Sequence, residues 1–515
     1  MPGVILSAHL KSAIRNYALL FAGCVLFHAL GTWTLPLIDR DEPRFAEASR
    51  EMIQRGDYIV PYFNNHLRLD KPPLTYWAQA ASYRLFSEND FAARFPSAIA
   101  AALIALSILA WGTRVGGNRV GWWAAIIFTF SLQTFLHAKA AVADMWLVLF
   151  VTLAHWSGFE LLGRSSSQSK HETSNAEHRT SNLWWWMFYV SLAFGFLAKG
   201  PIGWTPLLTV GSTIIFAGKS QLGKRFKFVR GVLLALAIVA LWGVPALIRT
   251  QGQFFTVGIG RHVIGRSFMT MEGHGANSFG MYLLLLPFYF VTIFVSFFPW
   301  SIKLPWLTRK LWQDRDKIDN GAGGSRATWT GKPERGDESI NYLIAGVAII
   351  FIIFSLIKTK LPHYTLPAFP LLALLLARKL AAEKATRFFR NCAFASASAY
   401  LAIALIVPPV VARFFPAYQL FRESRDYLRP GMEFGAVNFN EPSLVWYFRS
   451  RVNGFLTPMD SRRAADFMTH AGPRFVIVPT SLAANRPANW KVLSVRGFNV
   501  AKGKQVDLTL VLKPE

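Results

Sequence analysis

The stretch from Leu37 to Trp77 gathers the residues of this chain whose types and spacing could perform chemistry. Asp41 and Glu42 are adjacent carboxylates at the predicted start of a helix, where exposed backbone N–H groups favour an anion. Further on, Lys71 precedes two prolines, which fix the backbone and begin a second amphipathic stretch. A carboxylate held on stiff local structure suits proton abstraction, and a cation held there suits a phosphate. The alternative is a solvated loop in which the charges satisfy one another.

Polar residues also gather at four other places, each at the predicted outer end of a hydrophobic segment. Ionisable groups at membrane depth are costly and usually mark a functional site, although a single lysine can instead extend its ammonium group to the membrane surface. Because all four places fall on the side that carries the acidic loop, they predict a cationic mouth suited to a lipid with a phosphate headgroup. These residues are His137, Lys139 and Asp144; Lys199; Arg261, His262 and Arg266; and Lys358, Lys360, His363 and Tyr364.

Hydrophobic helices must position these residues. Hydrophobic residues make up 52% of the chain and aromatic residues 15%, which predicts an all-α polytopic membrane protein with a smaller soluble part. We predict about eleven transmembrane helices, although several segments fall short of the roughly twenty residues that a bilayer requires. Short or proline-containing segments such as 202–217 are candidates for re-entrant or broken helices. The predicted segments are 16–36, 94–113, 121–137, 143–162, 183–198, 202–217, 231–248, 280–301, 340–357, 364–378 and 392–413.

The formal net charge of +26 is explained by its distribution along the chain. With the N-terminus in the cytoplasm, the loops predicted to face inward are rich in Lys and Arg, which is the positive-inside pattern of membrane proteins. Nucleic-acid binding is therefore only a minor alternative. The same orientation places the first loop, residues 37–93, on the periplasmic side of a bacterial inner membrane. The first hydrophobic segment shows no persuasive cleavage site and is predicted to remain as an anchor.

The composition changes after the last predicted transmembrane segment. From residue 414 onward, strand-like runs alternate with helical patterns, which predicts a small α/β domain over 414–515 after a transmembrane domain over 1–413. An odd number of transmembrane helices would place this domain on the periplasmic side, with the first loop. Its Asp, His and Arg residues show no catalytic spacing, so we predict a lid, a support or an acceptor-docking module.

Five motifs carry a resemblance to a known family: DEPRFAE, DKPPLTYW, AVAD, FLAKGP and KTKLPHYTLPAFP. Over about residues 16–413 the chain resembles the bacterial aminoarabinose transferases of lipid A modification. More broadly, it resembles the protein O-mannosyltransferase superfamily, with its C-type glycosyltransferase fold. The resemblance implies an integral membrane enzyme that takes a sugar from a polyprenyl-phosphate carrier at the periplasmic face. The sugar would pass to a hydroxyl or phosphate acceptor on lipid A, a glycan or a protein.

The resemblance also implies roles for individual residues. It places Asp41 at the reaction centre, with Glu42 beside it. The chain departs from the family at Asp70, where a glutamate is expected before the lysine. The residues implied to bind the donor phosphate are Arg44, Lys71, Lys199 and Arg266, and those implied to hold or support the acceptor are Asp70, Asp144, His262, Lys360 and Tyr364.

The chemistry can be completed by these side chains without a cofactor. Glycosyl transfer needs a group that accepts or orients the acceptor proton and groups that stabilise charge on the leaving phosphate. Asp41 could do the first for a hydroxyl acceptor; a phosphate acceptor is already ionised, and Asp41 would then orient it or stabilise the reacting carbon. Arg44, Lys71 and Lys199 could do the second. We therefore predict no metal and no cofactor, although an Asp-Glu pair can bind Mg²⁺ or Mn²⁺.

A membrane transporter for a lipid or glycan is the alternative to an inverting glycosyltransferase, because charged residues within a membrane also mark translocation pathways. The sequence shows no apparent inverted repeat. Its charged motifs gather at one outer face, whereas a transporter would line a path through the bilayer midplane. The sequence therefore favours the transferase.

Overall fold

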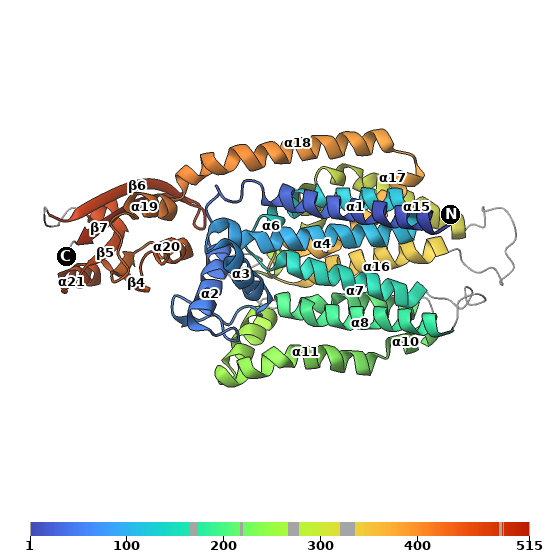
Figure 1. The fold of residues 1–515 in the computed structure, drawn as a ribbon, viewed down its shortest axis with the longest axis horizontal. Coiled ribbons are helices and arrows are strands. Elements are labelled where there is room, and N and C mark those ends of the chain that lie inside the picture. The colour runs from blue at the N-terminus through green and yellow to red at the C-terminus, as the bar shows by residue number, and fades with distance from the viewer. Residues whose placement is uncertain are drawn as a thin grey trace.

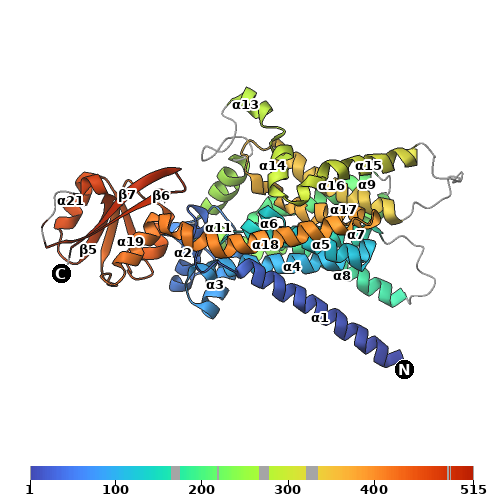
Figure 2. The same cartoon turned by 90° about the horizontal axis from the view of Figure 1, so that it is seen from above.

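The computed structural model describes residues 2–163, 174–216, 220–265, 278–319, 335–483, 487 and 489–513, and most of these are helical. Long helices form one end of the molecule, a five-stranded sheet forms the other, and the helices of the first loop lie between them (Figure 1 and Figure 2). The predicted fold class, a helical membrane protein with a small C-terminal α/β domain, is confirmed.

Seven helical segments within the described residues are long and apolar enough to cross a membrane. An eighth candidate is the pair α5 (Asn118–Thr129) and α6 (Leu132–Ala138), which is bent by 66°. The seven are formed by α1 (Pro2–Ala29), α4 (Asp90–Gly116), α7 (Asp144–Gly163), α10 with α11 (Ser220–Phe226 and Phe228–Arg249), α16 (Arg335–Leu356), η4 with α17 (Pro362–Ala368 and Phe369–Ala382), and α18 with η5 (Thr386–Val411 and Ala412–Phe414).

This number is lower than the eleven or so predicted because some predicted segments are short or broken. The segment 202–217 forms a short 3-10 turn and a short apolar helix, η1 (Pro201–Trp204) and α9 (Thr205–Phe216). The segment 280–301 is divided among three short elements, with Pro287 and Pro299 standing where two of them begin. These elements are α13 (Phe279–Leu284), α14 (Phe288–Ser296) and η3 (Trp300–Lys303); α15 (Leu304–Asp319) follows, and α8 (Ser174–Lys199) contains the predicted segment 183–198.

Two glycines allow α8 and η1 to meet closely. A Cβ atom on Gly203 would lie 2.4 Å from the backbone carbon of Gly195, so Gly203 has no room for a side chain, and a Cβ atom on Gly195 would lie 3.2 Å from the Cα atom of Gly203, which is a tight contact. Between them, Gly200 has a φ of +81°, a conformation that residues with a side chain rarely adopt. This tight turn fixes the end of α8, and with it Lys199, beside α7.

The first loop forms two helices, α2 (Asp41–Arg55) and α3 (Leu74–Phe86). A small hairpin, β1 (Tyr62–Phe63) and β2 (His66–Leu67), joins them. Gly56 ends α2 with a φ of +65° and donates its backbone N–H to the carbonyl of Ile53. The helix predicted to start at Asp41 and the amphipathic segment predicted after the prolines are both present.

The C-terminal domain is a mixed sheet in the order β4-β3-β5-β7-β6. β3 pairs in parallel with β4 and with β5 through crossover helices, whereas β7 runs antiparallel to β5 and β6. Phe434, Phe448 and Phe475 pack against one another in its core. The elements are α19 (Pro416–Ser424), β3 (Glu433–Val437), α20 (Pro442–Phe448), β4 (Leu456–Met459), α21 (Ser461–Thr469), β5 (Arg474–Pro479), η6 (Thr480–Leu482), β6 (Lys491–Asn499) and β7 (Lys504–Lys513).

Buried ion pairs hold α20 of this domain against α2 of the first loop. Arg50 lies 2.7 Å from a carboxylate oxygen of Glu47 and donates to the backbone carbonyl of Trp446. Arg449 pairs with Glu47 and with Glu51. Removing one member of a buried pair is costly because it leaves the other charge uncompensated. These contacts therefore hold the C-terminal domain against the first loop, on the same side of the helical bundle.

A second set of contacts joins the domain to the start of the loop. Asp39 accepts hydrogen bonds from the backbone N–H (2.9 Å) and the hydroxyl (2.5 Å) of Ser443. The backbone N–H of Leu37 donates to the hydroxyl of Tyr447 at 2.9 Å. Burial raises the pKa of Asp39 to about 7 despite the two hydrogen bonds from Ser443.

Candidate active site

The two adjacent carboxylates of the first loop have opposite environments. Asp41 is exposed in the first turn of α2. Glu42 is only 4% exposed, and its two oxygens accept from the guanidinium of Arg94 at 2.9 and 2.6 Å and from the backbone N–H groups of Ile38 and Ala141, each at 2.7 Å. Glu42 thus ties the first loop to α4 and to the segment before α7, and it has little capacity left for a substrate.

Arg68 joins Tyr76 and Asp70 within the first loop. Its Nε donates to the hydroxyl of Tyr76 at 2.8 Å and lies 3.2 Å from an oxygen of Asp70. Burial acts to lower the pKa of Arg68, but Asp70, Tyr76 and Asp41 together raise it above its ordinary value. Arg68 therefore stays charged and supplies a fixed positive charge beside Asp70.

A cavity of about 460 Å³ opens at the ends of α7, α8 and η4. Its polar end is formed by Lys71, Asp144, Lys199 and His363. The rest of its wall is mostly apolar, with Leu147, Val148, Ile202, Leu207, Leu208, Ile353, Phe354 and Ile357 among the lining residues. The cavity can therefore hold a long apolar chain with an anionic group at its polar end.

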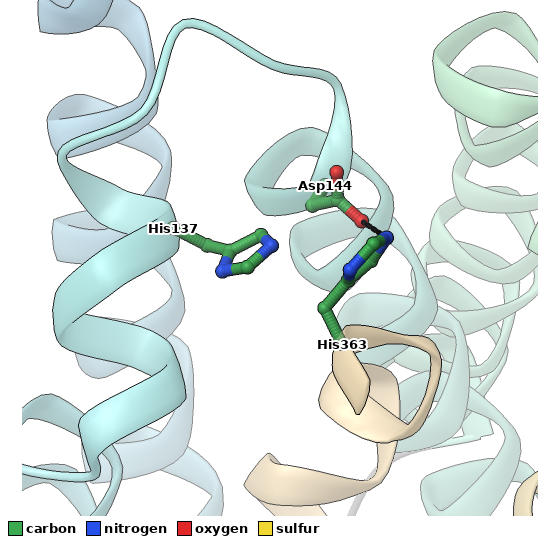
Figure 3. A group of neighbouring side chains, drawn as sticks. All are labelled: His137, Asp144 and His363. Carbon is green, nitrogen blue, oxygen red and sulfur yellow. Dashed lines mark ion pairs between the residues drawn. The ribbon is translucent and has the colours of Figure 1, made fainter. Parts of the chain in front are cut away.

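The polar end is organised around Asp144, the first residue of α7. Lys199 places its ammonium nitrogen 2.6 Å from an oxygen of Asp144 and 5.6 Å from the centre of the Tyr364 ring. The same oxygen of Asp144 lies 3.9 Å from Nε2 of His363, and His137 faces the pair from α6 (Figure 3). Four elements, α6, α7, α8 and η4, thus bring these side chains together.

A second cavity, of about 180 Å³, is lined by the same lysines. Lys71, Lys199 and Pro201 line both cavities. Asp70 joins the two lysines in the second cavity, and the remaining wall is largely apolar, with Phe196, Val239, Trp242, Leu247, Phe254 and Phe255 among its residues. The two lysines are consequently placed to contact occupants of both cavities.

The sequence and the structure of this chain both match known glycosyltransferases. Residues 18–259 match the family described as dolichyl-phosphate-mannose-protein mannosyltransferase. The crystal structure of ArnT from Cupriavidus metallidurans bound to undecaprenyl phosphate matches with a TM-score of 0.70 at 17% identity, over 96% of this chain and 98% of that chain. The chain has the C-type glycosyltransferase fold. Its predicted resemblance to the aminoarabinose transferases and the protein O-mannosyltransferase superfamily is confirmed.

Two curated relatives match the chain in sequence. The undecaprenyl phosphate-alpha-4-amino-4-deoxy-L-arabinose arabinosyl transferase of Aeromonas salmonicida is 29% identical over 359 residues, which cover 68% of this chain and 58% of that protein. The protein of the same name from Aeromonas hydrophila is 28% identical over 407 residues, which cover 78% of this chain and 66% of that protein. The chain thus spans about three fifths of the length of these relatives.

Several residues predicted from the sequence converge in this C-type glycosyltransferase fold. Lys71, Asp144, Lys199 and Tyr364 line the larger cavity, and Asp70 lines the smaller one. These residues come from the first loop, α7, α8 and η4, which are far apart in the sequence. The predicted cationic mouth therefore has a counterpart in the lysines between the two cavities.

Other predicted residues lie elsewhere or outside the described part of the chain. Asp41 and the half-buried Arg44 are not among the lining residues of the two cavities. Arg266 lies outside the described residues, and so does the side chain of His262, whose backbone belongs to η2 (Phe254–Gly265).

Two lysines of the predicted mouth instead bind helix ends. Lys360 donates to the carbonyls of Phe354 and Ser355 at 3.0 and 2.6 Å, at the end of α16, and burial lowers its pKa to about 8. Lys139 donates to three carbonyls at the end of α1, and burial lowers its pKa to about 7. A lysine at a helix C-terminus satisfies carbonyls that the helix leaves unpaired. Lys360, expected to support an acceptor, is therefore committed to α16.

Two further side chains shape the site although no role was predicted for them. Arg94 holds Glu42, and Arg68 pairs with Asp70. His363, which was predicted to belong to the cationic mouth, lines the larger cavity. One feature of the sequence could have identified Arg94. It is the first residue of the apolar segment 94–113, where an unpaired cation would be costly and a carboxylate partner is expected.

Proposed function

We propose that this chain is an inverting glycosyltransferase that uses a polyprenyl-phosphate-linked sugar, with its active site on the periplasmic side of a bacterial inner membrane. The observation that carries this proposal is the apolar cavity that ends at Lys71 and Lys199. Its shape and charge suit an isoprenoid chain with an anionic headgroup. The names of the relatives, which are arabinosyl transferases, support it, as does the undecaprenyl phosphate bound to the related ArnT.

The proposed donor lies with its isoprenoid chain along the apolar wall and its phosphate at the lysines. In a site that excludes water, an ammonium group stabilises a phosphate more strongly than it does in bulk solvent. During transfer, the bond between the anomeric carbon and the phosphate oxygen breaks, and negative charge builds on the leaving phosphate. Lys71 and Lys199 are placed to stabilise that charge.

The acceptor oxygen attacks the anomeric carbon from the face opposite the leaving phosphate, so the configuration is inverted. If the acceptor is a hydroxyl, its proton passes to a base, and we assign this role to Asp41 because it is the exposed carboxylate of the first-loop motif. If the acceptor is a phosphate, no proton has to move, and Asp41 orients the acceptor or stabilises positive charge on the sugar ring. Lipid A is the acceptor to test first, ahead of another envelope glycan or a protein.

The transfer step in this proposal needs no metal, because the two lysines supply the positive charge at the leaving group. We expect a large excess of EDTA over the protein to leave the transfer rate unchanged. The rate would be measured with purified protein before and after chelation. Loss of transfer that Mn²⁺ or Mg²⁺ restores would contradict metal-independent transfer.

A lipid or glycan transporter is the weaker alternative. The charged lining residues of the larger cavity all belong to its polar end rather than following a path along the helices. In proteoliposomes, a transporter would move a labelled polyprenyl-phosphate sugar between leaflets without changing its covalent structure. A transferase would convert the acceptor instead.

The deciding experiment uses the full-length protein in lipid nanodiscs, with undecaprenyl-phosphate-linked 4-amino-4-deoxy-L-arabinose as donor and lipid A as acceptor. We expect mass spectrometry to show the added sugar on lipid A. Lys199→Met should reduce it about 10²- to 10³-fold, whereas Lys310→Met should not, because Lys310 of α15 pairs with Glu383 and lines neither cavity. If this acceptor fails, periplasmic glycans and proteins are the next ones to test; movement of the donor across the bilayer with no product on any acceptor would contradict the proposal.

A further inference from the structure

Three potential metal ligands from three separate elements meet beside the larger cavity. They are His137 of α6, Asp144 at the start of α7 and His363 of η4. One ligand atom from each lies within 4.8 Å of the other two. Figure 3 shows both imidazole rings and the carboxylate turned toward a common space.

The donor set matches a particular class of metal. Two imidazoles with one carboxylate are typical ligands of Zn²⁺ and of other divalent transition metals, whereas Mg²⁺ and Ca²⁺ prefer oxygen ligands. Ligand atoms around a tetrahedral Zn²⁺ lie about 3.4 Å apart, given metal–ligand distances of about 2.1 Å. Small side-chain rotations would therefore close the observed group onto an ion.

The surroundings also hold the ligands in place. Nδ1 of His137 lies 2.9 Å from the side-chain amide of Gln133, one turn earlier on α6. An amide can be turned to accept from Nδ1–H, which leaves Nε2 of His137 available as a ligand. Outer partners of this kind orient metal-binding histidines. Asp144 is only 8% exposed, and the partial charge at the start of α7 favours its ionised form as a ligand.

Lys199 is the competitor for this carboxylate. Its ammonium group lies 2.6 Å from the oxygen of Asp144 that faces His363. We propose that His137, Asp144 and His363 form a binding site for a divalent transition metal, Zn²⁺ first among them, which competes with Lys199 for Asp144. A cation at the three ligands and the ammonium group cannot both take the same carboxylate at close range without strong repulsion.

This competition gives the metal site a link to the cavities, because Lys199 lines both of them. Occupation by a metal releases the ammonium group from Asp144. Binding of the metal itself does not depend on the proposed transferase activity, so the two proposals can fail separately.

The test measures Zn²⁺ binding by isothermal titration calorimetry on full-length protein in nanodiscs, purified with a tag that lacks histidine. We expect one Zn²⁺ per chain in the wild type. His137→Ala and His363→Ala should each weaken the affinity about 10-fold or more. His66→Ala is the matched control, because His66 is an exposed histidine of the first-loop hairpin, and it should leave the affinity unchanged.

The most decisive variant in this titration is Lys199→Met, which removes the competing ammonium group. It should raise the Zn²⁺ affinity about 10-fold, an effect in the direction opposite to that of the histidine variants. Partial misfolding cannot produce tighter binding at this site. The proposal is overturned if the double variant His137→Ala, His363→Ala binds Zn²⁺ as the wild type does, or if Lys199→Met leaves the affinity unchanged or weaker.

Discussion

The joint between the first loop and the C-terminal domain and the lysine wall between the two cavities are both rich in charge, but their charges are used differently. At the joint, Glu47, Arg50 and Arg449 are almost completely buried and bind one another. At the wall, Lys71 and Lys199 face hollow space that a ligand can enter. Charge density therefore does not by itself distinguish side chains that hold the fold together from side chains that a ligand can reach; the cavities make that distinction.

The largest expected change in transfer rate comes from Asp41, the exposed one of the two adjacent carboxylates of α2. Asp41→Asn should lower transfer to a hydroxyl acceptor about 10²- to 10⁴-fold, because the amide cannot accept the proton. The thermal unfolding temperature should change little, since Asp41 is exposed. Initial rates with purified enzyme at saturating donor would measure the effect. A rate equal to that of the wild type would remove Asp41 from the reaction centre.

Lys199→Met should lower the rate of transfer about 10²- to 10³-fold, the range found when one group that stabilises developing negative charge is lost. The single change also leaves the buried Asp144 carboxylate without its closest cation. The double variant Lys199→Met, Asp144→Asn removes both charges and controls for that cost. A double variant that folds and transfers sugar at the normal rate would place the leaving-group charge elsewhere.

Glu42→Gln should act on stability rather than on chemistry. It breaks a buried pair with Arg94, and such losses cost about 3–5 kcal/mol of unfolding free energy. Denaturant unfolding in detergent would measure it, with Glu88→Gln as a partly exposed comparison from the same loop. If Glu42→Gln keeps full stability but loses transfer, Glu42 belongs to the reaction centre together with Asp41.

The smallest effect is a pH dependence of the joint. Asp39 has a pKa of about 7 in the folded protein, against 3.8 for the free group, so the folded state binds the proton more tightly. Its contribution to stability is therefore greatest below about pH 4, falls as the pH rises toward 7, and is constant above that. Hydrogen exchange of the α20 backbone between pH 5 and 8 would report it. Asp39→Asn should flatten the profile, and an unchanged profile would exclude Asp39 as its source.

The sequence contained enough information for the fold class and for part of the site. Hydrophobic segments predicted the helical bundle, and the motifs around Lys71, Asp144 and Lys199 predicted side chains that do line one cavity. Lys360 was less predictable, because a lysine that binds the carbonyls at a helix end has the same local sequence as one that points into a cavity. The sequence also did not show which residue pairs with a buried charged side chain.

Glu42 and Arg94 illustrate that limit, since they are far apart in the sequence and each looks unpaired there. Only the close packing of the first loop on α4 shows that they bind one another. The number of transmembrane helices was limited for another reason: prolines such as Pro287 and Pro299 divide an apolar stretch into elements too short to span a membrane. Hydrophobicity alone does not register such breaks.

The lysines shared by the two cavities have a consequence for the order of events in each catalytic cycle. In the transfer reaction proposed above, Lys71 and Lys199 would form a single anchoring point, so a spent carrier that still holds it would block the arrival of a fresh donor. Egress of the spent carrier into the surrounding lipid must then precede reloading. We expect the first turnover after mixing to be faster than those that follow.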